Sequence, residues 1–397
     1  MGFVKHVYDN VHGYIGLTEV EVSVVDTPTF QRLRRVSQLG PAELVYPGAT
    51  HTRFAHSLGA MHLAGRLAQV VVPEADRQLI RLAALLHDVG HPPFSHTLEQ
   101  ATGVSHEEVG RILTRSGELS DVISAQGYDP AEVAEVAWGR TRLESLVISS
   151  PLDADRLDYL LRDSLHTGVT YGRPDVERIL RVIRRVSLGG SPALGVPARS
   201  LHAVEHFLLC RAFMFRTVYL HKTVVAFELM LSRAYELASE LTGLPTGDEL
   251  IDLASSPNWP RFDDHAVACA LRAVAAESEP VAELVSDLEA RRPPKLVAER
   301  GGEEGDRLLE AGCEGIAGEA GVPSHWVLIG TPSLPSAGHA GLITVVSEDG
   351  SVVPLESATS GLVPPEVLVA AQRTVRVYTR PEYAGRVAEA VRKVLRR

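Results

Sequence analysis

Histidine and aspartate side chains are concentrated in one stretch of this sequence. Seven of its sixteen histidines fall between residues 51 and 106, and the densest segment is LLHDVGHPPFSH. His87 and Asp88 are adjacent there, at the end of an apolar run. Neighbouring helical residues point about 100° apart, so this pair can bind one ion only in a groove that other helices complete.

Imidazole and carboxylate ligands together suit a divalent metal ion, which lowers the pKa of bound water and polarises a phosphoryl oxygen. The alternative is a buried ionisable pair with no task, and burying such a pair is costly. We therefore predict a metal site at His87 and Asp88, with further ligands from other helices.

A second acidic cluster lies in SSPLDADRLDYLLRD. Asp153, Asp155, Asp158 and Asp163 cannot all bind one metal, because their directions on a helix differ. Helix capping and surface ion pairs are equally good explanations for any one of them. The residues alone leave this choice open.

The elements that must position these residues are mainly helical. Apolar residues recur at helical spacing through residues 1–240, most clearly at 77–89, and GVTYGRPD at 168–175 interrupts the pattern as a loop. Residues 241–319 are expected to be a helical extension and linker, with the exposed run RRPPKLVAERGGEEGDR. Residues 320–397 have strand-length β-branched runs, an Asp-Gly hairpin signal in SEDGSV and a closing amphipathic helix. The predicted fold is mainly α, a helical core with a small C-terminal α+β appendage.

Composition excludes several classes of protein. The net charge of −11 argues against broad nucleic-acid binding, although a local cationic cluster can still bind a triphosphate. Three separated cysteines make a disulfide framework or a cysteine zinc site unexpected. The N-terminus lacks the apolar region of a signal peptide, and no window is apolar enough for a membrane span. A cytoplasmic location is expected.

The motifs HTRFAHSLG, LLHDVGHPPFSHTLE and DADRLDYLLRD occur in that order, preceded by NVHGYIGL, VVDTPTFQRLRRVSQLG and YPGATHTRFAHSLG. This set resembles the HD-domain superfamily. More narrowly, it is similar to the deoxynucleoside triphosphate triphosphohydrolases, including the SAM-and-HD-domain protein and its bacterial relatives. The resemblance covers about residues 6–240, and its HD-domain core matches the predicted helical core.

The resemblance implies roles for individual residues. The metal ligands would be His56, His87, Asp88 and Asp155. The catalytic group would be His91, His96 and His106, with Glu99 orienting His96. The substrate contacts would be Gln38, Leu39, Arg53, Arg156, Tyr159, Asp163, Arg211 and Tyr219. Among these, Arg156 stands where relatives often have lysine, and a bidentate arginine is not equivalent to lysine.

The implied activity is metal-dependent hydrolysis of a deoxynucleoside triphosphate to the deoxynucleoside and inorganic triphosphate. The metal, Mn, Mg, Fe, Zn, Co or Ni, and the preferred base remain open. Two alternatives also remain: an HD phosphohydrolase acting on another nucleotide or nucleoside phosphate ester, and an inactive regulatory module that binds nucleotides. Filled ligand and catalytic positions count against the second.

Regulation is a further implication of the resemblance. Some relatives are oligomers with an allosteric nucleotide site built partly from a DTPxFQRLR segment, which Asp26, Gln31 and Arg34 match. A homo-oligomer is expected on this basis, and a nucleotide effector is conceivable. For this segment we favour a simple helix start, with Asp26 or Thr27 capping, Pro28 in the first turn and the arginines facing solvent.

Overall fold

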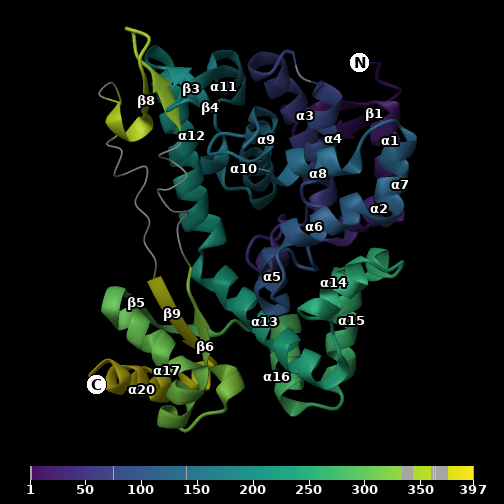
Figure 1. The fold of residues 1–397 in the computed structure, drawn as a ribbon. Helices are drawn as coiled ribbons and strands as arrows, with labels where there is room; N and C mark the ends of the chain where they lie inside the picture. The colour runs from purple at the N-terminus through teal and green to yellow at the C-terminus, as the bar shows by residue number, and fades with distance from the viewer. Residues whose placement is uncertain are drawn as a thin grey trace.

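The computed structural model describes residues 2–74, 76–139, 141–332, 343–358, 361, 363 and 374–396. The chain begins with an antiparallel hairpin of β1 (Lys5–Asp9) and β2 (Gly13–Leu17), followed by a helical core (Figure 1). The core helices are α1 (Glu19–Val25), α2 (Pro28–Gln31), α3 (Arg53–Val71), α4 (Arg77–Leu86), α5 (His96–Thr102), α6 (His106–Arg115), α7 (Gly117–Ala125), α8 (Pro130–Trp138), α9 (Leu143–Ile148), α10 (Ala154–Thr167) and α11 (Val176–Val182).

Helix α3 is the centre of this core, and it packs against both α4 and α10. Most of its residues are buried, as its Ala- and Leu-rich sequence predicts. Helix α4 begins at an Asp76 cap, whose carboxylate accepts the Gln78 amide at 2.8 Å. The packing of α3 against α4 and α10 brings the histidine and aspartate motifs of three separate segments to one place.

Two hairpins depart from the helical pattern expected for residues 1–240. One is β1–β2, and the other pairs β3 (Arg184–Leu188) with β4 (Ser191–Pro197). A signal for the first was present, since Gly13 follows a short polar turn and adopts a φ of 70° that favours glycine. These hairpins do not change the class of the fold.

Helices continue beyond the core as α12 (Leu201–Met214), a π-helical turn η5 (Phe215–Tyr219), α13 (Lys222–Thr242), α14 (Asp248–Ala254), α15 (Asp264–Ala275) and α16 (Glu279–Glu289). Helix α13 packs against α5, α15 and α16, and against the 3-10 turn η2 (Gly40–Leu44). The second group of helices therefore covers one side of the core instead of standing apart from it.

The C-terminal sheet has the order β5-β9-β6, formed by β5 (Lys295–Gly301), β6 (Leu328–Gly330) and β9 (Thr374–Thr379). Helices α17 (Gly302–Ala320) and α20 (Ala384–Arg396) cover it around a separate small apolar core (Figure 1). Most residues of RRPPKLVAERGGEEGDR are exposed, as expected, but the expectation that this run is a linker is wrong, because it forms β5 and the start of α17.

The hairpin expected at SEDGSV is present as β7 (Thr344–Val346) and β8 (Val352–Pro354). It does not join the C-terminal sheet. Strand β7 pairs in parallel with β4, so the hairpin extends the sheet of the N-terminal region. The domain limits at residues 240 and 319 stay a prediction, whereas the mainly α fold with a small sheet-containing C-terminal region is confirmed.

Among the described residues, no helix combines the length and the apolarity needed to cross a bilayer.

Candidate metal centre and active-site cavity

The four aspartates of the second acidic cluster have four different surroundings. Asp153 caps α10 and accepts the Arg156 amide at 2.7 Å. Asp155, in the first turn, faces His56 and His87. Asp158, one turn on, lies behind His56, and Asp163 pairs with His51 at 2.7 Å. The packing of α10 on α3 resolves what the residues alone left open.

One group of side chains has the geometry of a metal site. His56, His87 and Asp155 each offer a ligand atom, and these atoms lie within 4.8 Å of one another. His56 Nε2 is 3.1 Å from Asp155 Oδ1, and His87 Nε2 is 3.7 Å from the same oxygen. Both Nε2 atoms are buried and have no hydrogen-bond partner among the described residues. Such orphaned acceptors facing a carboxylate fit a divalent metal ion.

Asp88 lies beside this group rather than within it. Its carboxylate oxygens are 3.5 Å from His56 Nε2 and 3.4 Å from His87 Nε2. It also forms an ion pair with Arg53 at 2.6 Å. Burial opposes charge on Asp88, but Arg53 and the neighbouring histidines outweigh it and hold the pKa of this carboxyl well below its usual range. Asp88 is therefore ionised and close enough to join the other three residues around one ion.

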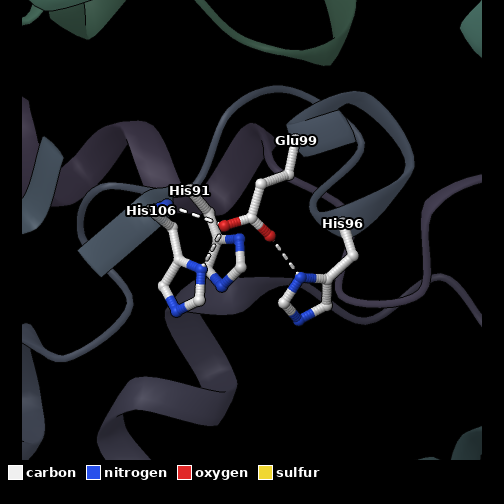
Figure 2. Close-up of side chains that lie close together, drawn as sticks. All are labelled: His91, His96, Glu99 and His106. Atoms are coloured by element: carbon white, nitrogen blue, oxygen red, sulfur yellow. Dashed lines mark hydrogen bonds and ion pairs between the residues drawn. The ribbon is translucent and has the colours of Figure 1, made fainter. Parts of the chain in front are cut away.

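A second cluster, formed by His91, His96, Glu99 and His106, has ligand-type atoms within 4.8 Å of one another (Figure 2). Figure 2 shows the Glu99 carboxylate between two imidazoles: His96 Nδ1 donates to one oxygen at 2.6 Å and His106 Nδ1 to the other at 2.7 Å. Burial favours the neutral acid, but these two hydrogen bonds lower the pKa of Glu99 well below its usual range. The ionised Glu99 carboxylate thereby fixes the orientation of the His96 and His106 rings.

His91 links the two clusters. Its ring stacks on His106 with a centroid distance of 3.9 Å, and its Nε2 is 3.2 Å from Asp88 Oδ1. His91 is four residues after His87, a spacing that would place both on one face of a continuous helix, but the helix does not continue. Helix α4 ends at Leu86, with His87 as its C-cap, so His91 reaches the site from the following turn.

The turn that leads to His96 has an unusual backbone conformation, which contacts with two distant segments stabilise. Phe94 and Ser95 both have a φ of 56°, a left-handed conformation unusual for these residues. Asp264 on α15 accepts the Phe94 amide at 2.7 Å, and Ser95 donates to the Ser37 carbonyl at 2.5 Å. Strained backbone beside reactive groups persists only when surrounding contacts enforce it, and these contacts do so.

A single cavity of about 600 Å³ adjoins both clusters. Its size is typical of a site for a small molecule. The cavity is lined by every expected substrate residue and by most of the expected metal and catalytic residues: Gln38, Leu39, Arg53, His87, Asp88, His91, His96, His106, Asp155, Arg156, Tyr159, Asp163, Arg211 and Tyr219. His56 and Glu99 do not line the cavity, but each contacts a residue that does: His56 contacts Asp155, and Glu99 binds His96.

Three arginines bring positive charge to the cavity lining. Arg53 is bound to Asp88, and Arg156 donates to the Ser150 carbonyl at 2.6 Å and pairs with Asp153. The Nε atoms of Arg156 and Arg211 are buried without a hydrogen-bond partner in the described part of the chain. These two arginines therefore retain donors for an anionic ligand.

The lining is also rich in other hydrogen-bonding groups. Tyr219 donates to Asp163 at 2.6 Å, and His51 contacts the other oxygen of the same carboxylate. Gln38 Oε1 is buried with no hydrogen-bond partner among residues that the structure describes. A hydroxyl-bearing ligand can satisfy these groups, as a sugar would.

Comparison with known proteins places this arrangement in a family. A model of the HD domain matches residues 53–161, which include all of the candidate metal ligands. A model of the HD associated region matches residues 175–396, more than half of the chain. The chain belongs to the HD-domain family. The family resemblance that the ordered motifs indicated is confirmed.

Several relatives of this HD protein are similar over part or all of it. An uncharacterised protein of Methanocaldococcus jannaschii is 43% identical over 231 residues, 58% of this chain and 49% of that protein. Human deoxynucleoside triphosphate triphosphohydrolase SAMHD1 is 28% identical over 292 residues, 60% of this chain and 46% of that protein. The crystal structure of a phosphohydrolase from Bacteroides thetaiotaomicron superposes with a TM-score of 0.76 at 26% identity, over 94% of this chain and 99% of that one.

The HD protein spans about half the length of the curated relatives it matches. Their activities are therefore not conclusions about this chain.

The DTPTFQRLRR segment of the HD protein is a helix start, as expected. Thr27 caps α2 by accepting the Phe30 amide, and Pro28 is the first helical residue. One part of the expectation is wrong, because Arg32 is buried and does not face solvent. It donates to the carbonyls of His91 at 2.8 Å and Phe262 at 2.5 Å. This segment thus supports the histidine cluster directly.

Sequence reasoning also missed the role of Asp158, which binds the metal-site histidine His56 from the side opposite the other ligands. Asp158 accepts His56 Nδ1 at 2.8 Å, His12 Nε2 at 2.6 Å and the Arg162 guanidinium at 2.9 Å. A hydrogen bond at Nδ1 leaves His56 Nε2 as the free acceptor and makes it more basic. The approach is so close that a Cβ at position 59 would lie 1.9 Å from the Asp158 carboxylate, which explains Gly59.

We expect Asp158→Asn to lower the affinity of the candidate metal site for a divalent metal about 10- to 100-fold. The reason is that a carboxylate bonded to the second ring nitrogen of a metal-binding histidine orients that histidine. Titration with Mn²⁺, followed by metal analysis, measures this affinity. Asp175→Asn, at the cap of α11, is the matched control, because asparagine also caps a helix. Unchanged metal affinity in a folded Asp158→Asn protein would contradict this role.

Proposed function

We propose that this HD protein hydrolyses a deoxynucleoside triphosphate to the deoxynucleoside and inorganic triphosphate, with a divalent metal ion at His56, His87, Asp88 and Asp155. The observation that carries the proposal is the single cavity whose lining combines metal-type ligands, the three histidines of the second cluster, arginines and a hydroxyl-binding group. A simple phosphate monoester would need fewer cations and no hydroxyl-binding group.

The arginine side of the cavity would bind the triphosphate. Arg53, Arg156 and Arg211 would neutralise its oxygens, because phosphoryl transfer depends mainly on positioning and charge stabilisation. When bound, the metal supplies Lewis-acid polarisation of a phosphoryl oxygen and a water of lowered pKa. Water would attack the α-phosphorus, so the bond to the 5′ oxygen of the nucleoside breaks.

The histidine–glutamate cluster would supply the proton for that departing oxygen. Glu99 holds His96 Nδ1 and leaves Nε2 directed away from the pair. His96 is exposed and lines the cavity, whereas His91 is buried, so His96 has the better access to a leaving group. The Glu99 carboxylate fixes the orientation of the His96 ring for proton donation.

The hydroxyl-binding group would hold the sugar. Asp163 and Gln38 are suited to the 3′ hydroxyl, and the Tyr159 ring would crowd a 2′ hydroxyl and so favour deoxynucleotides. The homo-oligomeric state, the nucleotide effector and the cytoplasmic location stay predictions beside this proposal.

A substrate panel tests the proposal. The purified protein is incubated with each dNTP, NTP and nucleoside monophosphate and with each of Mn²⁺, Mg²⁺, Fe²⁺, Zn²⁺, Co²⁺ and Ni²⁺, and the products are separated by anion-exchange chromatography. We expect equimolar deoxynucleoside and triphosphate from dNTPs in at least one metal. If only the monophosphates release phosphate, the substrate is another phosphate ester. If no compound of the panel is hydrolysed, the result favours a regulatory module.

A further inference from the structure

Glu228 is a cavity residue that the proposed reaction does not use. It lies on α13, one helical turn after Val224, and both residues line the cavity. Within the described part of the chain, its carboxylate forms no hydrogen bond and no ion pair. Most of the other acidic residues near the cavity, including Asp88, Asp155 and Asp163, have a cationic or hydrogen-bonding partner.

An unpartnered, partly buried carboxylate is costly for the fold. Burial raises the pKa of Glu228 to about 7. The Tyr378 hydroxyl, on β9, is close enough to feel its charge but is buried without a hydrogen-bond partner of its own. Because the Glu228 carboxylate faces a cavity, a ligand with hydrogen-bond donors could provide the partners that it lacks.

The position of Glu228 indicates which part of a nucleotide it meets. The sugar-side residues Gln38 and Leu39 run directly into η2, and η2 packs against α13. Gly40 and Ala42 of η2 line the cavity together with Val224 and Glu228. This wall carries no arginine, and a carboxylate would repel a triphosphate. Beyond the sugar and away from the phosphates, the remaining part of the substrate is the base.

We propose that Glu228 determines base specificity by accepting two adjacent N–H donors, so that the preferred substrate carries guanine. This inference rests on the proposed function. The N1–H and 2-amino groups of guanine lie side by side and match the two oxygens of one carboxylate. Thymine offers one N–H between two carbonyl oxygens, which repel a carboxylate. Adenine and cytosine offer an amino group beside an acceptor nitrogen, so they satisfy only one oxygen.

The test compares kcat/KM for dGTP and dTTP in the full chain and in Glu228→Gln. The wild-type protein is expected to prefer dGTP. In Glu228→Gln the value for dGTP is expected to fall about 10- to 100-fold, mainly through KM, because charge-assisted hydrogen bonds to the base are lost. The value for dTTP is expected to change less than about 3-fold, because thymine does not use the carboxylate. Glu240→Gln, an exposed glutamate on the same helix, is the matched control.

Equal losses for dGTP and dTTP, or no change for dGTP, would overturn the role of Glu228. Calorimetric binding of deoxyguanosine and thymidine to both proteins separates this inference from the proposed reaction. If no dNTP is hydrolysed but deoxyguanosine binds more tightly than thymidine, and only in the wild-type protein, the base site stands and the proposed reaction fails. If the two nucleosides bind alike, the inference fails.

Discussion

Replacing His87 and Asp88 together by alanine is expected to remove the bound divalent metal and to reduce hydrolysis at least about 1,000-fold, since metal assistance contributes several kcal/mol and each 1.4 kcal/mol is tenfold in rate. The two side chains supply a buried imidazole, whose Nε2 has no hydrogen-bond partner among the described residues, and a carboxylate 3.5 Å from His56 Nε2. Metal content by mass spectrometry and turnover of the best dNTP measure both effects.

The double variant needs a folding control, because removing Asp88 leaves Arg53 without its ion-pair partner. Thermal unfolding reports whether the helical core survives. The double variant His202→Ala/His206→Ala, with two exposed histidines on α12, should retain both metal and activity. Unchanged turnover in a folded His87→Ala/Asp88→Ala protein would contradict the metal assignment.

Replacing His96 by alanine is expected to lower kcat about 100- to 10,000-fold while metal content and KM change little. This is the range for loss of a general acid. Glu99→Gln should lower kcat by less, because His96 remains but its Nδ1 loses the carboxylate that orients the ring from 2.6 Å. Steady-state kinetics with the best dNTP provide both parameters.

A matched control for His96 is His265→Ala, at an exposed histidine on α15. A loss of activity there would indicate a general effect of histidine removal. Near-full activity in His96→Ala would remove this residue from the role of acid, and His91 or His106 would become the candidate.

The helical spacing of apolar residues predicted the helical core, because this signal is local. The apolar spacing of residues 77–89 and the Asp76 cap suffice to predict α4. The choice among the four aspartates of α10 needed the packing partner. Asp155 and Asp158 are both aspartates and lie one turn apart, so the sequence does not distinguish them. The position of His56 on α3 does: Asp155 lies beside Nε2, the candidate metal-binding atom, and Asp158 binds Nδ1.

The C-terminal strand β5 was missed for a physical reason. It lies at the edge of its sheet, and its charged residues Lys295, Glu299 and Arg300 are exposed, while Ala298 faces the small apolar core. Charged residues are common on edge strands because they discourage pairing with another chain, and the same composition is typical of a linker. Glu228 could not be predicted either, since a single glutamate on an amphipathic helix carries no sign of a cavity beside it.

Hydrolysis of a dNTP in ¹⁸O-labelled water, with mass spectrometry of both products, identifies the phosphorus atom that water attacks. Attack of water on the α-phosphorus puts one ¹⁸O atom into inorganic triphosphate and leaves the deoxynucleoside unlabelled, and this is the predicted result. Labelled phosphate or pyrophosphate with a nucleotide as the second product would contradict the account, because the arginines, histidines and sugar-binding group would then be arranged around a different bond.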